Sequence, residues 1–260
     1  MKLATWNVNS IRARLERLLA WLAKQQPDLL CLQELKVKDE DFPFDALRAA
    51  GWQAVAHGQP TYNGVAILSR QPLADVRRGL DDEVDDLQAR LVSARVGGLT
   101  VLSAYVPNGH EVGSDKWDYK LAWLKRLRRH LEKHHRPDEA LALCGDFNVA
   151  PEARDVCDPA GWEPTVLYHP QARAALAELA AWGLQDAFRL HHQAGGLYSW
   201  WDYRRLAFPK NQGLRIDHVL LTAPLARRCR AAHIDRDERK GQQPSDHAPV
   251  VVELDPWPVP

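Results

Sequence analysis

Short, continuous apolar runs recur along the chain, and they restrict the possible folds more than any other feature of the sequence. Residues 29–32 (LLCL) and 140–144 (ALALC) are the clearest, and each has the length of a strand covered on both faces. Longer segments between such runs place apolar residues at helical spacing, as from Ser10 to Pro27 and from Trp117 to Leu131. We predict roughly ten strands in two packed mixed sheets with helices outside, which is a four-layer α/β sandwich.

The length of the chain is compatible with one large domain. Its 260 residues are enough to bury a sizeable core, and no repeat, low-complexity segment or linker divides them. We therefore expect one domain over residues 1–260. Lysine plus arginine equals aspartate plus glutamate, 34 each, so the net charge is zero. This balance does not exclude a polyanionic ligand, because such binding depends on a local basic patch.

Charged residues are concentrated in a few places. Residues 125–136 and 227–230 are basic, whereas residues 81–86 (DDEVDD) are acidic. A charged run of this kind is most often a solvated face. The basic group within residues 204–215 is more suggestive of nucleic-acid binding, because aromatic residues are interleaved with it.

Cysteine usage and the N-terminus favour an intracellular location. The four cysteines show neither paired nor metal-ligand spacing, as expected in a reducing compartment. The N-terminus lacks a signal-peptide pattern, and no apolar run approaches the ~18 residues that a membrane span needs. We expect a cytoplasmic protein without a membrane segment. Five histidines show no ligand spacing and are expected on the surface: His130, His134, His135, His191 and His192.

Polar side chains stand at the ends of six of the predicted strands. Any one of them is more often a cap or a turn residue than a functional group. Six such ends are harder to explain as turns, because ligand-binding and catalytic groups gather on loops held by a rigid scaffold. The residues are Asn7, Glu34, Tyr105, Asn108, Asp146, Asn148, Asp217, Asp246 and His247.

These residue types favour one kind of chemistry. Carboxylates and amides are oxygen donors that suit a hard cation such as magnesium, whereas zinc would prefer a cysteine and histidine cluster. Asp217 could orient the imidazole of His247, as carboxylates commonly do. A divalent cation, a carboxylate base and an oriented histidine are the components needed to hydrolyse a phosphodiester.

Several motifs stand in a characteristic order: WNVNSIR, LQE, YVPNG, GDFNVAP, RIDHVL and PSDHAPV. In these motifs the chain resembles the exonuclease III family of apurinic/apyrimidinic endonucleases, within the metal-dependent phosphodiesterases that resemble pancreatic DNase. The resemblance extends from residue 1 to about residue 254 and is closest to the compact bacterial members. The segment YSWWDYRRLAFPKNQGLRIDHVL is similar to the abasic-site pocket loop of this family.

The resemblance implies a metal site. Glu34 is expected to be the main ligand of a magnesium ion, for which manganese could substitute. Asp246 is expected to support the metal side of the site. The full set of expected ligands is Glu34, Asn7, Asp146, Asn148, Asp246 and His247.

The resemblance also implies catalytic roles. Asp146 is expected to activate the attacking water, positioned by Asn148. His247, oriented by Asp217, is expected to stabilise the charge that develops on the scissile phosphate. Tyr105 is expected to lie near the phosphate or the leaving group.

Contacts with DNA are implied as well. Trp200 matches the aromatic residue of the abasic-sugar pocket, which Leu214 and Ile216 would line. Trp201 is explained equally well by core packing. Further expected contacts are Asn108, Arg90, Lys116, Arg204, Arg205 and Lys210. If the bulky Tyr168 and His169 face the pocket, they would limit the entry of an abasic sugar and favour trimming of 3′ ends.

We therefore predict a magnesium-dependent DNA repair nuclease that cuts duplex DNA 5′ to abasic sites and removes nucleotides or blocking groups from 3′ ends. It is expected to act as a monomer without an obligate protein partner. One alternative is a phosphodiesterase or phosphatase of the same scaffold that acts on a lipid or an inositol phosphate. The other is a non-catalytic DNA-binding module, which would be expected to have lost Glu34, Asp146 or His247.

Overall fold

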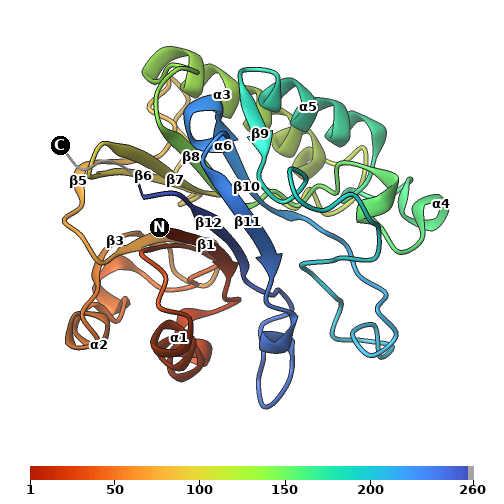
Figure 1. Cartoon of the computed structure of the whole chain (residues 1–260). Helices are drawn as coiled ribbons and strands as arrows, with labels where there is room; N and C mark the ends of the chain where they lie inside the picture. Colours follow the sequence, from red (N-terminus) through yellow and green to blue (C-terminus); the bar gives the residue numbers. More distant parts are fainter. Residues whose placement is uncertain (257–260) are drawn as a thin grey trace.

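Two six-stranded mixed sheets pack against each other in the computed structural model, which describes residues 1–256 (Figure 1). The first sheet has the order β11-β12-β1-β2-β4-β3, and the second has the order β5-β6-β7-β8-β10-β9. The strands of the first sheet are β1 (Lys2–Asn7), β2 (Leu29–Gln33), β3 (Gln53–His57), β4 (Val65–Ser69), β11 (Cys229–Ile234) and β12 (Val250–Leu254). Those of the second are β5 (Ala74–Arg78), β6 (Leu91–Val96), β7 (Leu99–Tyr105), β8 (Leu141–Asp146), β9 (Leu184–Asp186) and β10 (Asp217–Thr222).

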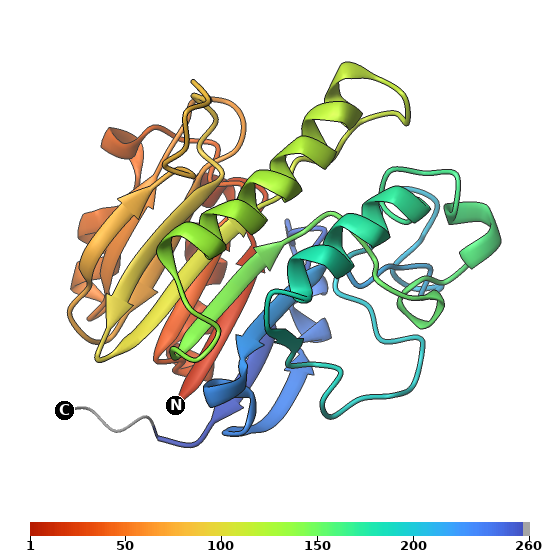
Figure 2. The same cartoon turned by 90° about the horizontal axis from the view of Figure 1, so that it is seen from above.

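Helices form the two outer layers, so the predicted four-layer sandwich is confirmed (Figures 1 and 2). The first sheet is covered by α1 (Ile11–Gln25) and α2 (Phe44–Ala49), and the second by α3 (Asp115–His134) and α5 (Pro170–Ala180). The short helices α4 (Pro159–Trp162) and α6 (Ala223–Ala226) lie in connections. Among the described residues, no helix combines the length and the apolar character that crossing a membrane requires.

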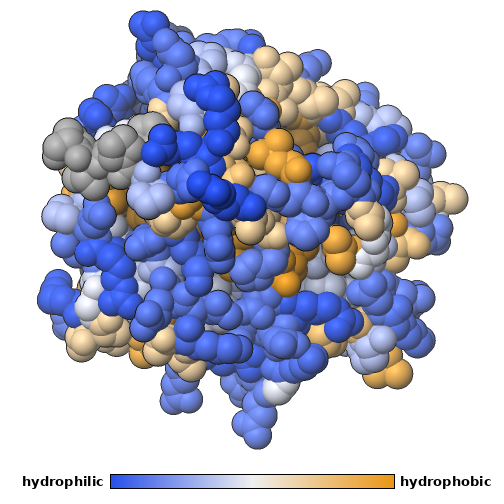
Figure 3. Space-filling view, viewed as in Figure 1, coloured by the Kyte–Doolittle hydropathy of each residue, from blue (hydrophilic) through white to orange (hydrophobic). Residues whose placement is uncertain are grey.

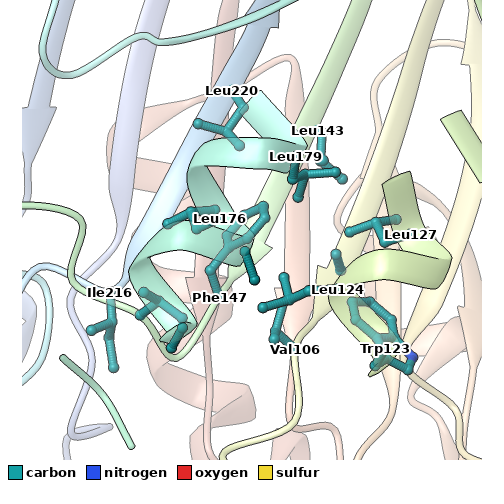
Figure 4. Packing of buried hydrophobic residues seen from close by; sticks show 14 of the residues in the cluster. Val106, Trp123, Leu124, Leu127, Leu143, Phe147, Leu176, Leu179, Ile216 and Leu220 are labelled. Atoms are coloured by element: carbon teal, nitrogen blue, oxygen red, sulfur yellow. The ribbon is translucent and has the colours of Figure 1, made fainter. Parts of the chain in front are cut away.

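The central strands are apolar throughout because each has a core on both faces. On β8, Leu141 and Leu143 belong to the cluster under α3 and α5, whereas Ala142 and Cys144 belong to the cluster between the sheets. This alternation follows from the two-residue period of a strand. In Figure 4, leucines of α3 and α5 converge on Leu143 and on Leu220 of β10.

The first helix begins and ends where the sequence indicates. The Ser10 side chain accepts a hydrogen bond from Ala13 N, and Gln26 closes the helix in the left-handed conformation just before Pro27. Its apolar face, with Ile11, Leu18, Trp21 and Leu22, is buried on the first sheet. This packing fixes the loop that leads from Asn7 into the helix.

The acidic run and one of the basic runs neutralise each other. Arg126 of α3 forms ion pairs of 2.7 Å with Asp82 and of 2.7 Å with Asp86, so residues 81–86 lie against α3.

The expectation that the histidines lie on the surface is wrong for His130, which is only 3% exposed and bonds Leu80 O at 2.7 Å. The face of the molecule in Figure 3 is mainly hydrophilic, with small separated hydrophobic spots.

Candidate active site

The strand topology brings the polar strand ends to one edge of the sandwich. β1 and β2 are parallel and end at Asn7 and Gln33, while β7 and β8 are parallel and end at Tyr105 and Asp146. β10 is antiparallel to β8, so its first residue, Asp217, pairs with Asp146. Residues from distant parts of the chain therefore meet because the strands share an edge.

A close approach between two strands places Asp146 at this edge. A side chain at the preceding residue, Gly145, would overlap the carbonyl oxygen of Ala104 on β7. Glycine is therefore required where β8 reaches the site. Burial raises the pKa of Asp146 to about 7. The negative charges of Asp217 and Glu34 also raise this pKa, whereas His247 and the hydrogen bond from Asn7 lower it.

Three predicted ligands form one cluster. A ligand atom of each of Glu34, Asp146 and His247 lies within 4.8 Å of the other two. Two carboxylates facing the same point suit a hard divalent cation, so the donor set is compatible with magnesium. The distance from His247 Nε2 to Asp146 Oδ2 is 3.7 Å.

Glu34 is held from two sides. Asn7 Nδ2 donates to Glu34 Oε1 at 2.9 Å and to Asp146 Oδ2 at 2.9 Å, so the amide bridges the two carboxylates. Its oxygen accepts from Asn9 N at 2.9 Å. Metal ligation by this oxygen stays a prediction. The Tyr105 hydroxyl donates to Glu34 Oε1 at 2.8 Å. Burial, together with Glu34 and Asp146, raises the pKa of Tyr105 well above its usual value, so the phenol keeps its proton.

His247 is oriented by Asp217, as the sequence predicts. Its Nδ1 lies 2.9 Å from Asp217 Oδ2, and both side chains are buried. Burial alone would lower the pKa of His247, but the carboxylates of Asp217 and Asp146 outweigh it and raise that pKa to about 10. A positively charged imidazole therefore faces the position next to Asp146.

The two asparagines form a chain toward Asp146. Asn148 N donates to Asp146 Oδ1 at 2.8 Å, and its side-chain Nδ2 lies 3.3 Å from Oδ2 of the same carboxylate. Asn108, which is exposed, donates through Nδ2 to Asn148 Oδ1 at 3.0 Å. These contacts fix the orientation of Asp146.

Asp246 lies apart from the three-residue cluster. Its carboxylate accepts from Trp200 Nε1 at 3.0 Å and from Asn9 Nδ2 at 2.9 Å. Burial would raise its pKa, but His247 and these hydrogen bonds lower it. Asp246 thus connects the predicted pocket loop to the first strand and supports the site from outside the cluster.

The pocket residues are arranged differently from the expectation. Leu214 and Ile216 are 0% and 1% exposed and belong to the core on which Trp200 packs, so here they support Trp200 and do not line an open surface. Trp162 lies edge-on to Trp200, with ring centroids 6.0 Å apart. Trp201 is fully buried, in agreement with core packing.

The bulky residues of the neighbouring segment also point elsewhere. Tyr168 is buried in the core cluster, with the Arg173 guanidinium 4.3 Å from its ring centroid. His169 caps α5 by accepting from Gln171 N and lies edge-on to Trp117. Trp162, and not these two residues, is the aromatic neighbour of Trp200.

The predicted phosphate contacts fall into two groups. Arg90, Asn108 and Lys116 line a cavity of about 500 Å³ that reaches Tyr105. Arg90 packs on the Tyr105 ring at 4.9 Å and donates to Tyr105 O at 3.2 Å. Arg204 and Arg205 are exposed beyond Trp200, and Arg204 pairs with Asp202 at 2.9 Å.

Known proteins resemble this chain over nearly its whole length. A model of the Endonuclease/Exonuclease/phosphatase family matches residues 4–247. The chain belongs to this family. It is 37% identical over 266 residues to the exodeoxyribonuclease III of Haemophilus influenzae, which covers 98% of this chain and 100% of that protein. The predicted resemblance to the exonuclease III group is confirmed, and the chain is a nuclease-type hydrolase.

Two solved structures of the family have nearly the same fold. An AP endonuclease from Archaeoglobus fulgidus superposes with a TM-score of 0.95 at 40% identity, covering 98% of this chain and 99% of that one. A 3′ phosphatase from Neisseria, solved with a product DNA hairpin, gives 0.94 at 41% identity, with coverage of 99% and 100%.

Several residues of this family member were missed in the sequence. Asn9 bonds Asp246, and Lys36 lies 3.0 Å from Glu34 Oε2. Ser199 donates to Asp217 Oδ2 at 2.6 Å, the same oxygen that His247 Nδ1 contacts at 2.9 Å. Lys120 is fully buried, and one signal could have found it, because it stands on the apolar stripe of α3 between Trp117 and Leu124.

Proposed function

We propose that this protein is a magnesium-dependent DNA repair nuclease that hydrolyses phosphodiester bonds 5′ to abasic sites and removes nucleotides or blocking groups from 3′ ends. The observation that carries the proposal is the cluster of half-buried Glu34 with buried Asp146 and His247, whose ligand atoms lie within 4.8 Å of one another. The names of the similar proteins, an exodeoxyribonuclease, an AP endonuclease and a 3′ phosphatase, support DNA as the substrate.

Glu34 and Asp146 would hold the cation, because a positively charged His247 has a proton on each ring nitrogen and offers no lone pair to a metal. When bound, magnesium would polarise a phosphoryl oxygen and offset the charge that develops there, and manganese could replace it. Asn7 and Tyr105 keep the Glu34 carboxylate in place through hydrogen bonds to Oε1 of 2.9 Å and 2.8 Å. Loss of either hydrogen bond would allow the Glu34 carboxylate to rotate.

Asp146 would act as the general base. Its carboxylate takes a proton from water, and the oxygen of that water bonds to phosphorus. The bond from phosphorus to the 3′ oxygen breaks, and the leaving 3′ oxygen takes up a proton from solvent. Asn148 and Asn7 leave the carboxylate little rotational freedom, because both donate to it. His247, kept positive by Asp217, would stabilise the added charge on the phosphate.

The DNA would extend from this cluster in two directions. Arg90, Asn108 and Lys116 would contact phosphates along the cavity that starts at Tyr105. Trp200 would contact the abasic sugar or the terminal nucleotide, with Arg204 and Arg205 beyond it. We propose that the protein acts as a monomer, since every residue of the cluster comes from one chain.

Two labelled duplexes test this proposal, each with magnesium and with a chelator. One carries a single stable abasic-site analogue, and the other is undamaged with a recessed 3′ end. We expect magnesium-dependent cutting 5′ to the lesion and shortening of the recessed strand. Shortening without lesion cutting would restrict the enzyme to 3′ ends. Absence of both reactions would overturn DNA as the substrate and would require trials with lipid and inositol phosphodiesters.

A further inference from the structure

Lys120 lies on the face of α3 that packs against the second sheet, and its side chain has no exposed surface. Its neighbours on the same helix face, Trp117 and Leu124, are apolar core residues. A buried cation is expensive unless hydrogen bonds or an opposite charge compensate it. Among the ion pairs of the described residues Lys120 has no carboxylate partner within 4.0 Å, so its compensation comes from hydrogen bonds and from the more distant charge of Asp146.

Three main-chain carbonyl groups surround the ammonium group. Lys120 Nζ donates to Asn108 O at 3.0 Å, to Asn148 O at 2.7 Å and to Val166 O at 2.7 Å. An ammonium group has three N–H donors and no acceptor, so all of its donors are used. The three acceptors belong to three loops: the one after β7, the one after β8 and the one that leads to α5.

The stem of the lysine is also enclosed. A side chain added at Gly109 would come within 2.9 Å of Lys120 Cδ, so the loop after β7 lies directly on the stem. Gly109 has a φ of +93°, a conformation that favours glycine. The loop is thereby fixed both by its backbone and by the lysine beneath it.

Two of the three carbonyl groups belong to the asparagines next to the proposed base. Asn108 donates to Asn148 through their side chains, and Asn148 donates to both oxygens of Asp146. The ammonium group therefore holds the backbone of both asparagines, whose side chains face Asp146 and the cavity of the proposed phosphate contacts. A displacement of either loop would move these amides relative to the carboxylate.

We propose that Lys120 is a positioning residue, which fixes the loops of Asn108 and Asn148 so that their amides hold Asp146 and meet the scissile phosphate. This proposal rests on the proposed nuclease function for its kinetic consequence, but the structural part can be measured without any activity.

The test compares Lys120→Met with Lys125→Met, an exposed lysine on the same helix that contacts no part of the site. On folded protein, we expect Lys120→Met to lower kcat about 100-fold with a much smaller change in KM, because small misplacements at a reacting centre have effects of this size. Lys125→Met is expected to leave both unchanged. An unchanged kcat for Lys120→Met would overturn the proposal.

A double-mutant cycle with Asn108→Ala separates positioning from general destabilisation. If Lys120 acts through the asparagines, Asn108→Ala will reduce kcat much less in the Lys120→Met background than in the unmodified protein. Independent, multiplicative effects would contradict the proposal.

Amide hydrogen exchange tests the loops directly, without substrate. Lys120→Met, or Lys120→Gln if the first variant does not fold, is expected to accelerate exchange at residues 106–110 and 146–150 while residues 2–7 of β1 keep their rate. Equal acceleration in all three segments would indicate a merely structural lysine. If neither variant folds, amide exchange in the unmodified protein tests the proposal. Opening of these two loops at a free energy well below that of global unfolding would overturn it, because the loops would then not be fixed. A protein without nuclease activity but with this exchange pattern would refute the proposed function alone.

Discussion

Two buried aspartates, Asp146 and Asp155, stand in opposite electrostatic surroundings. They are 1% and 0% exposed, so desolvation acts on both. At Asp146 it raises the pKa to about 7, whereas at Asp155 Arg215 and Arg189 outweigh burial and lower the pKa. Arg215 contacts Asp155 at 2.7 Å and Asp186 at 2.7 Å, so this second cluster balances its own charge.

The comparison separates a reactive cluster from a structural one. The reactive cluster has three carboxylates, those of Glu34, Asp146 and Asp217, around two cations, Lys36 and His247, so a divalent cation or a proton would relieve its excess of negative charge. The group of Asp155, Arg189 and Arg215 needs no further ion and ties the segment after β8 to the segment before β10. A buried carboxylate with a strongly raised pKa is typical of a functional site.

The largest expected difference concerns activity after Asp146→Asn. The substitution keeps the volume but removes the base, so cleavage of both duplexes is expected to fall by at least about 100-fold. DNA binding, measured by fluorescence anisotropy in chelator, is expected to survive because the phosphate contacts are unchanged. An Asp146→Asn enzyme with near-normal turnover would remove Asp146 from the role of base.

Asp155→Asn is expected to give the opposite result. It leaves the buried guanidinium group of Arg189 without its carboxylate and that of Arg215 with Asp186 alone, and breaking a buried pair in this way typically costs about 3–5 kcal/mol of unfolding free energy. The specific activity of the remaining folded enzyme, assayed well below its melting temperature, is expected to stay near normal. The control is Asp138→Asn, whose exposed pair with Arg136 is screened by solvent, so this variant is expected to leave the denaturant midpoint nearly unchanged. Equal denaturant midpoints for both variants would contradict a structural role for Asp155.

The effect of magnesium on the melting temperature distinguishes the two clusters while Asp146 stays in place. A ligand that binds only the folded state raises the melting temperature, so magnesium is expected to stabilise the unmodified protein. Glu34→Ala is expected to abolish this shift and to raise the magnesium concentration needed for half-maximal cleavage by at least about tenfold. Asp155→Asn, although less stable, is expected to keep the shift. An identical magnesium titration for Glu34→Ala would exclude Glu34 as a ligand.

At acidic pH, the cluster of Asp155, Arg189 and Arg215 is expected to contribute less to the free energy of unfolding. The folded pKa of Asp155 lies below the usual value of 3.8, so its stabilising contribution is fully present above that pH. The contribution is lost as the pH falls through the lower, folded value, because the carboxylate then becomes protonated. The stability gap between the unmodified protein and Asp155→Asn is therefore expected to be constant near neutral pH and to narrow below about pH 4. Urea midpoints over this range measure it, and a constant gap would contradict the assigned charge state.

The sequence predicts the reactive cluster better than the balanced one. Glu34, Asp146 and His247 each stand at the end or just before the start of an apolar strand, so the strand pattern singles them out, and the family resemblance implies that they form one site. Asp155, Arg189 and Arg215 come from irregular segments far apart in the chain, and no local pattern indicates that they pair. Leu214 and Ile216 were expected to line a surface, but their apolar side chains are satisfied by the core beneath Trp200.

Lys120 is a second case in which the sequence does not reveal the contacts of a buried side chain. The apolar periodicity correctly predicts that α3 packs on the sheet. A lysine within this apolar stripe breaks the pattern, and no other sequence feature indicates which group it bonds. The partners are main-chain carbonyls of three loops, which composition and spacing cannot reveal. Side-chain motifs can be read from a sequence, whereas contacts to the backbone depend on the completed fold.

The smallest expected effect concerns Trp200, which links the reactive cluster to the substrate without belonging to it. Its ring packs on the core and against Trp162, and its Nε1 donates to Asp246. An aromatic contact of this kind contributes about 1 kcal/mol, so Trp200→Ala is expected to reduce abasic-site incision roughly fivefold more than trimming of a recessed 3′ end. Trp200→Phe keeps a ring but loses the hydrogen bond to Asp246, and it is expected to restore most of that preference. Equal losses in both reactions for Trp200→Ala would mean that the ring supports Asp246 and does not select the substrate.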